Sequence, residues 1–151
     1  MPSIDASIVV PGQAAQLGRL NDFLGSFWEL HDLPFADLMR MELCLEEVYI
    51  NVVTHGIEGV PPPPGHDEHP VTLTLSLDDG RVEMTVEDHG VAFDPLAEEE
   101  VDTAMPMEER GIGGLGIHLV KTLMQEVRYE RTGDRNRLVM TAVLGASAEG
   151  A

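Results

Sequence analysis

Three polar side chains recur at four-residue intervals in one segment of the chain. Glu47, Asn51 and His55 are four residues apart, so on a helix they project from the same side. A carboxylate can accept a proton, and a carboxamide oxygen is a hard ligand that suits Mg²⁺. The spacing therefore predicts a base and a magnesium ligand one helical turn apart. It also fits the polar outer face of an amphipathic helix, with His55 beside Gly56 in a structural role at the helix end.

A second polar segment starts where an alternating stretch ends, at Asp88. A carboxylate at the end of a strand can accept a hydrogen bond from an exocyclic amine such as that of adenine. Gly90 has no side chain, so its backbone can approach a flat base closely. An aspartate and a glycine so near each other are also common in simple turns, which is the alternative here.

The third segment is rich in glycine and precedes an expected helix. Its glycines are Gly111, Gly113, Gly114 and Gly116. Backbone amides and the positive end of a helix dipole suit phosphate oxygens. A dinucleotide-binding loop is not favoured, because that loop follows a strand in a βαβ unit and antiparallel hairpins flank this one. A P-loop is excluded, because no Lys-Ser or Lys-Thr pair follows the glycines.

Periodicity along the chain predicts the elements that position these segments. We expect strands at 3–10, 71–77, 82–86, 127–132 and 137–144, and helices at 14–30, 36–54 and 115–123. Turns are expected at 78–80 and 133–136, a surface loop at 60–70, and a mobile connection at 94–112. This order predicts an α+β fold, a two-layer sandwich in which a mostly antiparallel or mixed sheet of about five strands carries three main helices on one face.

Length and charge limit the possible functions. The 151 residues suit one domain spanning 1–151, with a frayed tail at 145–151. The net charge of −18 argues against nucleic acid or an anionic membrane as the partner. No apolar run is long enough for a membrane span and the N-terminus has no secretion leader, so we expect a cytoplasmic protein. The single cysteine, Cys44, lies in an apolar stretch that predicts a buried and inert thiol.

Taken together, the three segments resemble the N, G1 and G2 boxes of the GHKL ATPases, the superfamily of gyrase and the histidine kinases. The resemblance runs from Glu46 to the closing hairpin. Within the superfamily the chain is most similar to the stand-alone anti-sigma-factor serine kinases of the RsbW type. Histidine kinases carry an asparagine where this chain has Glu47, and the helix pair through which they dimerise is not found in this sequence.

The resemblance implies the Bergerat ATP-binding fold and a role for each matching residue. Asn51 would ligate Mg²⁺ at the ATP phosphates, and Asp88 would hold the adenine amine. Gly90 would form the floor under the base, and Ala92 stands where many relatives have a second glycine. Glu47 would be the general base that takes the proton from a serine or threonine hydroxyl. Gly111, Gly113, Gly114 and Gly116 would shape the lid over the phosphates, and Arg110 beside them is a candidate phosphate contact.

The same resemblance implies the partners. ATP and Mg²⁺ are the expected cofactors, and ATP and ADP are the expected nucleotide ligands. The expected function is transfer of the ATP γ-phosphate to a serine or threonine of a STAS-type anti-anti-sigma factor, alternating with binding of a sigma factor. A homodimer is a further expectation, since relatives often dimerise. The alternative is a nucleotide-gated module that binds a partner without phosphorylating it. No role is assigned to His89 or His118.

Overall fold

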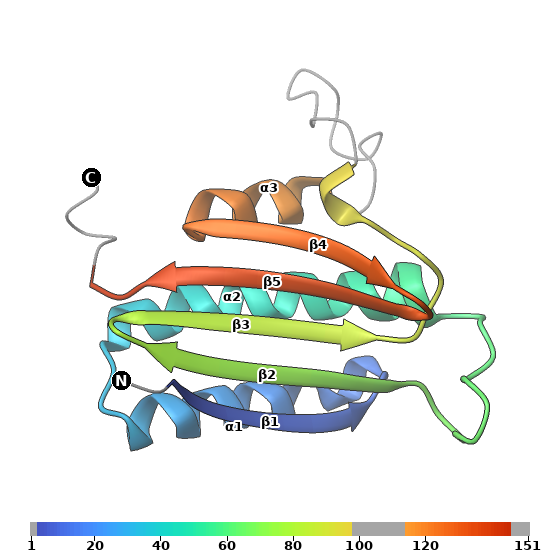
Figure 1. The fold of residues 1–151 in the computed structure, drawn as a ribbon, viewed down its shortest axis with the longest axis horizontal. Coiled ribbons are helices and arrows are strands. Elements are labelled where there is room, and N and C mark those ends of the chain that lie inside the picture. The colour runs from blue at the N-terminus through green and yellow to red at the C-terminus, as the bar shows by residue number, and fades with distance from the viewer. Residues whose placement is uncertain (1–2, 98–113, 146–151) are drawn as a thin grey trace.

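One antiparallel sheet with helices on one face makes up the part of the chain that a computed structural model describes, residues 3–97 and 114–145. In these residues the sheet has five strands in the order β1-β2-β3-β5-β4, and α1 and α2 pass behind it (Figure 1). The expected two-layer α+β fold is confirmed. None of the described helices is both long and apolar enough to cross a membrane.

The elements follow the predicted order. The strands are β1 (Ile4–Pro11), β2 (Pro70–Asp78), β3 (Arg81–Asp88), β4 (Glu126–Thr132) and β5 (Arg135–Val143). The helices are α1 (Leu17–Leu30), α2 (Phe35–Asn51) and α3 (Gly114–Leu123), with short 3₁₀ turns η1 (Ala14–Gln16) and η3 (Pro95–Ala97) and a π-helical turn η2 (Val52–Ile57).

Alternation in β2 fixes which side of the sheet carries the core. Leu73 and Leu75 are fully buried, whereas Thr72 and Thr74 are half-buried on the other face. A one-residue slip would reverse these faces, so the buried leucines hold the register. The tight turn between β2 and β3 is Asp79-Gly80, both with positive φ, as expected for a two-residue hairpin.

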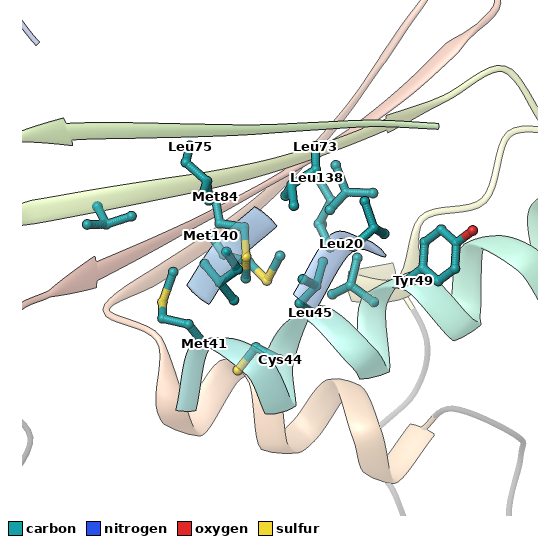
Figure 2. Close-up of a cluster of buried hydrophobic side chains, with 14 of the residues drawn as sticks. Leu20, Met41, Cys44, Leu45, Tyr49, Leu73, Leu75, Met84, Leu138 and Met140 are labelled. Atoms are coloured by element: carbon teal, nitrogen blue, oxygen red, sulfur yellow. The ribbon is translucent and has the colours of Figure 1, made fainter. Parts of the chain in front are cut away.

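The core lies between the sheet and α2 (Figure 2). Met41 and Leu45 of α2 are fully buried, as are Met84 of β3 and Met140 of β5. Each such side chain contributes roughly 1.5–3 kcal/mol through removal from water. Cys44 is also fully buried, and burial raises the pKa of its thiol to about 11. The predicted burial of this thiol is therefore confirmed.

Several predicted boundaries were wrong, and two of them lie near Asn51 and Asn136. The second helix was expected to run as an α-helix to residue 54, but α2 ends at Asn51 and continues as the wider η2 turn. A π-turn differs from an α-turn by one extra residue per hydrogen bond, which periodicity over a few residues does not reveal. The turn expected at 133–136 is shorter, because β5 already begins at Arg135. Asn136 is therefore a strand residue.

Arg40, near the start of α2, links this helix to the ends of α3 and β5. Its guanidinium donates to the carbonyl oxygens of Leu123, at the end of α3, and Val143, at the end of β5, both at 2.8 Å. It also pairs with the buried carboxylate of Asp37 at 2.8 Å. A buried charge needs such partners to offset its lost hydration. The position of α2 relative to α3 is set by these contacts.

Candidate functional site

A pocket opens at the end of the sheet where α2 stops. Most of its lining is apolar, with a few polar groups, which is typical of small-molecule sites. The lining residues come from α2, η2, β3, the segment that follows β3, α3, β4 and β5: Val48, Asn51, Val52, Gly56, Val86, Asp88, Phe93, Pro95, Ile117, Tyr129, Asn136 and Leu138.

Asp88, the last residue of β3, lies in this pocket and is 3% exposed. Its Oδ1 accepts hydrogen bonds from the backbone N–H of Gly90 at 2.8 Å and from Nδ2 of Asn136 at 3.0 Å. In the part of the chain that the structure describes, Oδ2 has no hydrogen-bond donor. The carboxylate is thus held at one oxygen and has the other free to accept from an amine on a ligand.

The surroundings of Asp88 act on its charge in opposite directions. Burial raises the pKa of the carboxyl above its ordinary value. The hydrogen bonds from Asn136 and Gly90 and the positive charge of Arg131 lower it, but by less. Arg131 also donates to the carbonyl oxygen of Gly90 at 2.8 Å. This side chain fixes the loop after β3 and places positive charge near the pocket of an acidic protein.

The backbone turn at Gly90 leaves no room for a side chain. A Cβ there would overlap the carbonyl oxygen of Gly56 and lie 3.0 Å from Oδ1 of Asp88. The backbone N–H of Val91 donates to the same Gly56 carbonyl at 3.0 Å. The backbone at Gly90 thus approaches the end of η2 closely, and the approach to a base that the sequence predicts for Gly90 stays a prediction.

We expect Gly90→Ala to destabilise the fold by about 1–3 kcal/mol, the usual cost of overpacking, because the obstructing atoms belong to the backbone. The free energy of unfolding in urea measures this loss. Gly18→Ala is the matched control: no atom lies within 4 Å of a Cβ at this position in α1, and alanine should stabilise the helix by about 0.5–1 kcal/mol. Equal stability of Gly90→Ala and wild type would contradict the tight approach.

Asn136 organises the pocket wall and was not found from the sequence. Besides its bond to Asp88, its Nδ2 donates to the carbonyl oxygen of Val91 at 2.8 Å. Its Oδ1 accepts from the Tyr129 hydroxyl at 2.5 Å and from the backbone N–H of Phe93 at 3.3 Å. The missed signal was register: Asn136 is directly opposite Asp88 in the β3–β5 pair, but it had been assigned to a turn.

The predicted base and metal ligand both lie on α2. Asn51 is its last residue, 7% exposed, and lines the pocket. In the described part of the chain its carboxamide makes no hydrogen bond to protein, so its oxygen can ligate a cation. Glu47, one turn earlier, is half-buried, and its carboxylate lies against Gly116 of α3 so closely that a Cβ there would overlap it.

The other predicted site residues do not all line the pocket. Ala92 is exposed and is not among the lining residues; the neighbouring Phe93 is. Gly114 is the first residue of α3. Arg110, Gly111 and Gly113 lie outside the described residues, so the phosphate contact predicted for Arg110 and the lid role predicted for the two glycines stay predictions.

His55, His89 and His118 have different neighbours. His55 stacks on Phe93 with ring centroids 5.1 Å apart, which places it behind the pocket wall. Nδ1 of His89 lies 3.3 Å from the carboxylate of Asp134, and this neighbour lowers the pKa of Asp134. His118 is exposed on α3.

The model of one protein family matches nearly the whole chain. Residues 10–142 match the family described as the histidine kinase-like ATPase domain. The chain belongs to this family. The predicted membership of the GHKL superfamily is therefore confirmed, and the pocket between α2 and the end of the sheet lies in a histidine kinase-like ATPase domain.

Two curated relatives of this histidine kinase-like ATPase domain are named as kinases. The serine/threonine-protein kinase BtrW of Bordetella bronchiseptica is 28% identical over 102 residues, which cover 68% of each chain. The serine-protein kinase RsbW of Bacillus cereus is 28% identical over 123 residues, which cover 79% of this chain and 72% of that protein.

Solved structures of low identity share the fold. The crystal structure of the RsbU and RsbW domains of Rv1364c from Mycobacterium tuberculosis superposes with a TM-score of 0.65 at 15% identity. It covers 95% of this chain, which spans 33% of the longer solved chain. A histidine kinase domain from Erythrobacter litoralis superposes with a TM-score of 0.52 at 19% identity over 93% of this chain. These likenesses show the ATPase fold.

Proposed function

We propose that this domain binds ATP with Mg²⁺ and phosphorylates a serine or threonine of a partner protein. The observation that carries the proposal is the position of α2. Asn51 lines the pocket that holds Asp88, and the carboxylate of Glu47, one turn earlier on α2, lies against the start of α3. The family supports the use of ATP, and the kinase names of the curated relatives support phosphoryl transfer to protein.

The apolar pocket suits the adenine base. Its walls include Phe93, Ile117 and Leu138, which would cover the faces of the ring, and Asp88 offers a free carboxylate oxygen to the exocyclic amine. Hydrogen bonds to a charged acceptor are stronger than neutral ones, so this contact would fix both the position and the identity of the base. A base with a carbonyl oxygen at that position would place one hydrogen-bond acceptor against another, the carboxylate oxygen of Asp88, and no hydrogen bond would form.

Asn51 would hold Mg²⁺, which neutralises phosphate charge when it is bound. Its carboxamide is a hard oxygen ligand without a protein partner in the described residues, and magnesium commonly takes one or two protein oxygens beside the phosphates and water. No group of three or more histidine, cysteine or acidic side chains that could hold a metal alone occurs within residues 3–97 and 114–145. The site is thus suited to a metal that the nucleotide brings.

Glu47 would act as the general base. A carboxylate one helical turn from the metal ligand can accept the proton of an incoming hydroxyl while the phosphoryl group is transferred. Contact with Gly116 fixes its distance from α3. A STAS-type anti-anti-sigma factor is the substrate that we propose, with a sigma factor as the second partner, from the resemblance of the three polar segments to the anti-sigma-factor serine kinases of the RsbW type. The serine kinases RsbW and BtrW among the curated relatives support the kinase part of this proposal.

Calorimetric titration of ATP and ADP, with and without Mg²⁺, into wild type and Asn51→Ala tests the nucleotide site. We expect metal-dependent binding by wild type, weakened about tenfold or more in the variant, a loss of roughly 1.4 kcal/mol or more. Titration without the metal should differ little between the two proteins. Absence of ATP binding by wild type would refute the proposal. ATP binding without transfer to any STAS-domain protein would favour the nucleotide-gated binding module.

A further inference from the structure

The side of α2 that faces away from the sheet carries a row of exposed apolar side chains. Phe35, Met39, Leu43 and Ile50 are 72%, 61%, 39% and 37% exposed. Their spacing places them on one helical face. Leu30, at the end of α1 just before the turn into α2, is 77% exposed. These five residues are called the α2 ridge below.

The α2 ridge is a second apolar stripe on a helix that already has one. Met41, Leu45 and Val48 fill the side that packs on the sheet, and α1 and α3 pack against α2 as well. A helix on the surface of a globular domain needs a single apolar stripe, with polar residues opposite. Scattered apolar residues on a surface need no explanation, but apolar side chains gathered on one face mark an interaction site.

The charges around the ridge are of one sign. Glu29, Asp32 and Glu46 are exposed there, and Glu42 is half-buried. The only lysine or arginine between residues 29 and 51 is Arg40, and its guanidinium is engaged with Asp37 and two backbone carbonyls. The ridge is therefore an apolar strip with acidic side chains beside it and one within it, because Glu46 is three residues after Leu43 and four before Ile50.

We propose that the α2 ridge docks an amphipathic helix of a partner protein, one with apolar residues in a row and lysine or arginine beside them. Opposite charges around an apolar contact favour the correct partner and speed its approach. A second copy of this chain would bring the same acidic side chains against one another, and each copy carries a net charge of −18. Charge complementarity selects a basic partner.

The ridge runs beside the proposed catalytic base. Leu43 is four residues before Glu47 and Ile50 three after it, so all three are neighbours on the helix surface. A partner docked on the ridge lies next to the carboxylate that would accept its hydroxyl proton. In this respect the inference rests on the proposed function, whereas docking itself is measured without nucleotide.

The test uses two synthetic helical peptides of roughly 18 residues, about five turns. Both carry leucines at four-residue and three-residue intervals; one has lysines beside them and the other glutamates. Each is titrated without ATP into wild type, Met39→Glu and Val9→Glu. Val9 is the matched control, because it is an exposed apolar residue, 56% against 61% for Met39, and lies on β1 away from α2.

We expect the lysine peptide to bind wild type and Val9→Glu equally, and Met39→Glu at least about tenfold more weakly, since each 1.4 kcal/mol is a factor of ten. The glutamate peptide should not bind. Simple attraction to an acidic protein predicts the reverse for Met39→Glu, because the extra negative charge would leave binding unchanged or tighten it. That result, or no binding of the lysine peptide to wild type, would overturn the proposal.

Two further measurements guard the interpretation. Thermal unfolding should show that Met39→Glu folds like wild type, since glutamate is a good helix former at an exposed position. Sedimentation of both proteins tests self-association: a wild-type dimer that Met39→Glu dissociates would make the ridge a contact between copies and overturn the proposal. Failure of ATP binding would leave the peptide result standing, so the two proposals are tested separately.

Discussion

Asp88→Asn should lower the affinity for ATP by a factor of about 100 or more. The asparagine oxygen would keep the bonds from Gly90 and Asn136, and its amide nitrogen would then face the pocket in place of the free carboxylate oxygen. A hydrogen bond to a charged group contributes roughly 1.5–3 kcal/mol, and an unpaired buried donor costs about 1–3 kcal/mol. Calorimetric titration of Mg-ATP measures the loss.

The stability of the same variant separates binding from folding. Because burial raises the pKa of Asp88 in the folded protein, ionisation of this carboxyl above that pKa makes folding less favourable. Asparagine removes this cost, so Asp88→Asn should be at least as stable as wild type at pH 7, and its advantage should disappear as the pH falls and Asp88 becomes protonated. Asp79→Asn, in the β2–β3 turn, is the control that should bind ATP normally. Unchanged affinity in Asp88→Asn would disprove the adenine contact.

Glu47→Gln should leave ATP binding intact and slow phosphoryl transfer by about 10²–10⁴-fold, the usual contribution of a general base. Glutamine keeps the length and shape of the side chain that lies against Gly116, but it cannot accept a proton at neutral pH. Transfer of phosphate from ATP to a STAS-domain protein, followed by the mass of the product, is the measurement. Parallel calorimetry establishes that the nucleotide is still bound.

Glu126→Gln is the control for this experiment, because it makes the same change in charge at an exposed residue of β4, outside the α2 ridge. Its transfer rate should match that of wild type. If Glu47→Gln transferred phosphate as fast as Glu126→Gln, Glu47 would not be the base. If Glu47→Gln alone lost ATP binding, its effect would lie in the nucleotide site and not in proton transfer.

The sequence was sufficient to predict the order of the helices and strands. It was also sufficient to place side chains whose position depends on a single helix or strand. Alternation in β2 and β3 and four-residue spacing in α2 are local properties, so the placement of Glu47 and Asn51 on one helix followed from them. Asp88 was correctly expected at a strand end for the same reason.

The remaining part of the pocket depends on contacts between distant elements. Phe93, Ile117 and Tyr129 meet around the pocket although they come from separate parts of the chain, and no local pattern distinguishes them from other apolar residues. Asn136 was missed because its partner depends on the β3–β5 register. The α2 ridge was not predicted either, because periodicity shows which residues share a helical face but not which face is buried.

The π-turn at the end of α2 has a consequence for how this fold can change in length. Its hydrogen bond from Glu58 to Val53 spans five residues, and the carbonyl of Gly56 leaves the helix to receive the N–H of Val91. Removal of one residue from this turn would restore an ordinary helix and withdraw that carbonyl from its partner. The length of η2 therefore sets where this carbonyl meets the segment that follows β3.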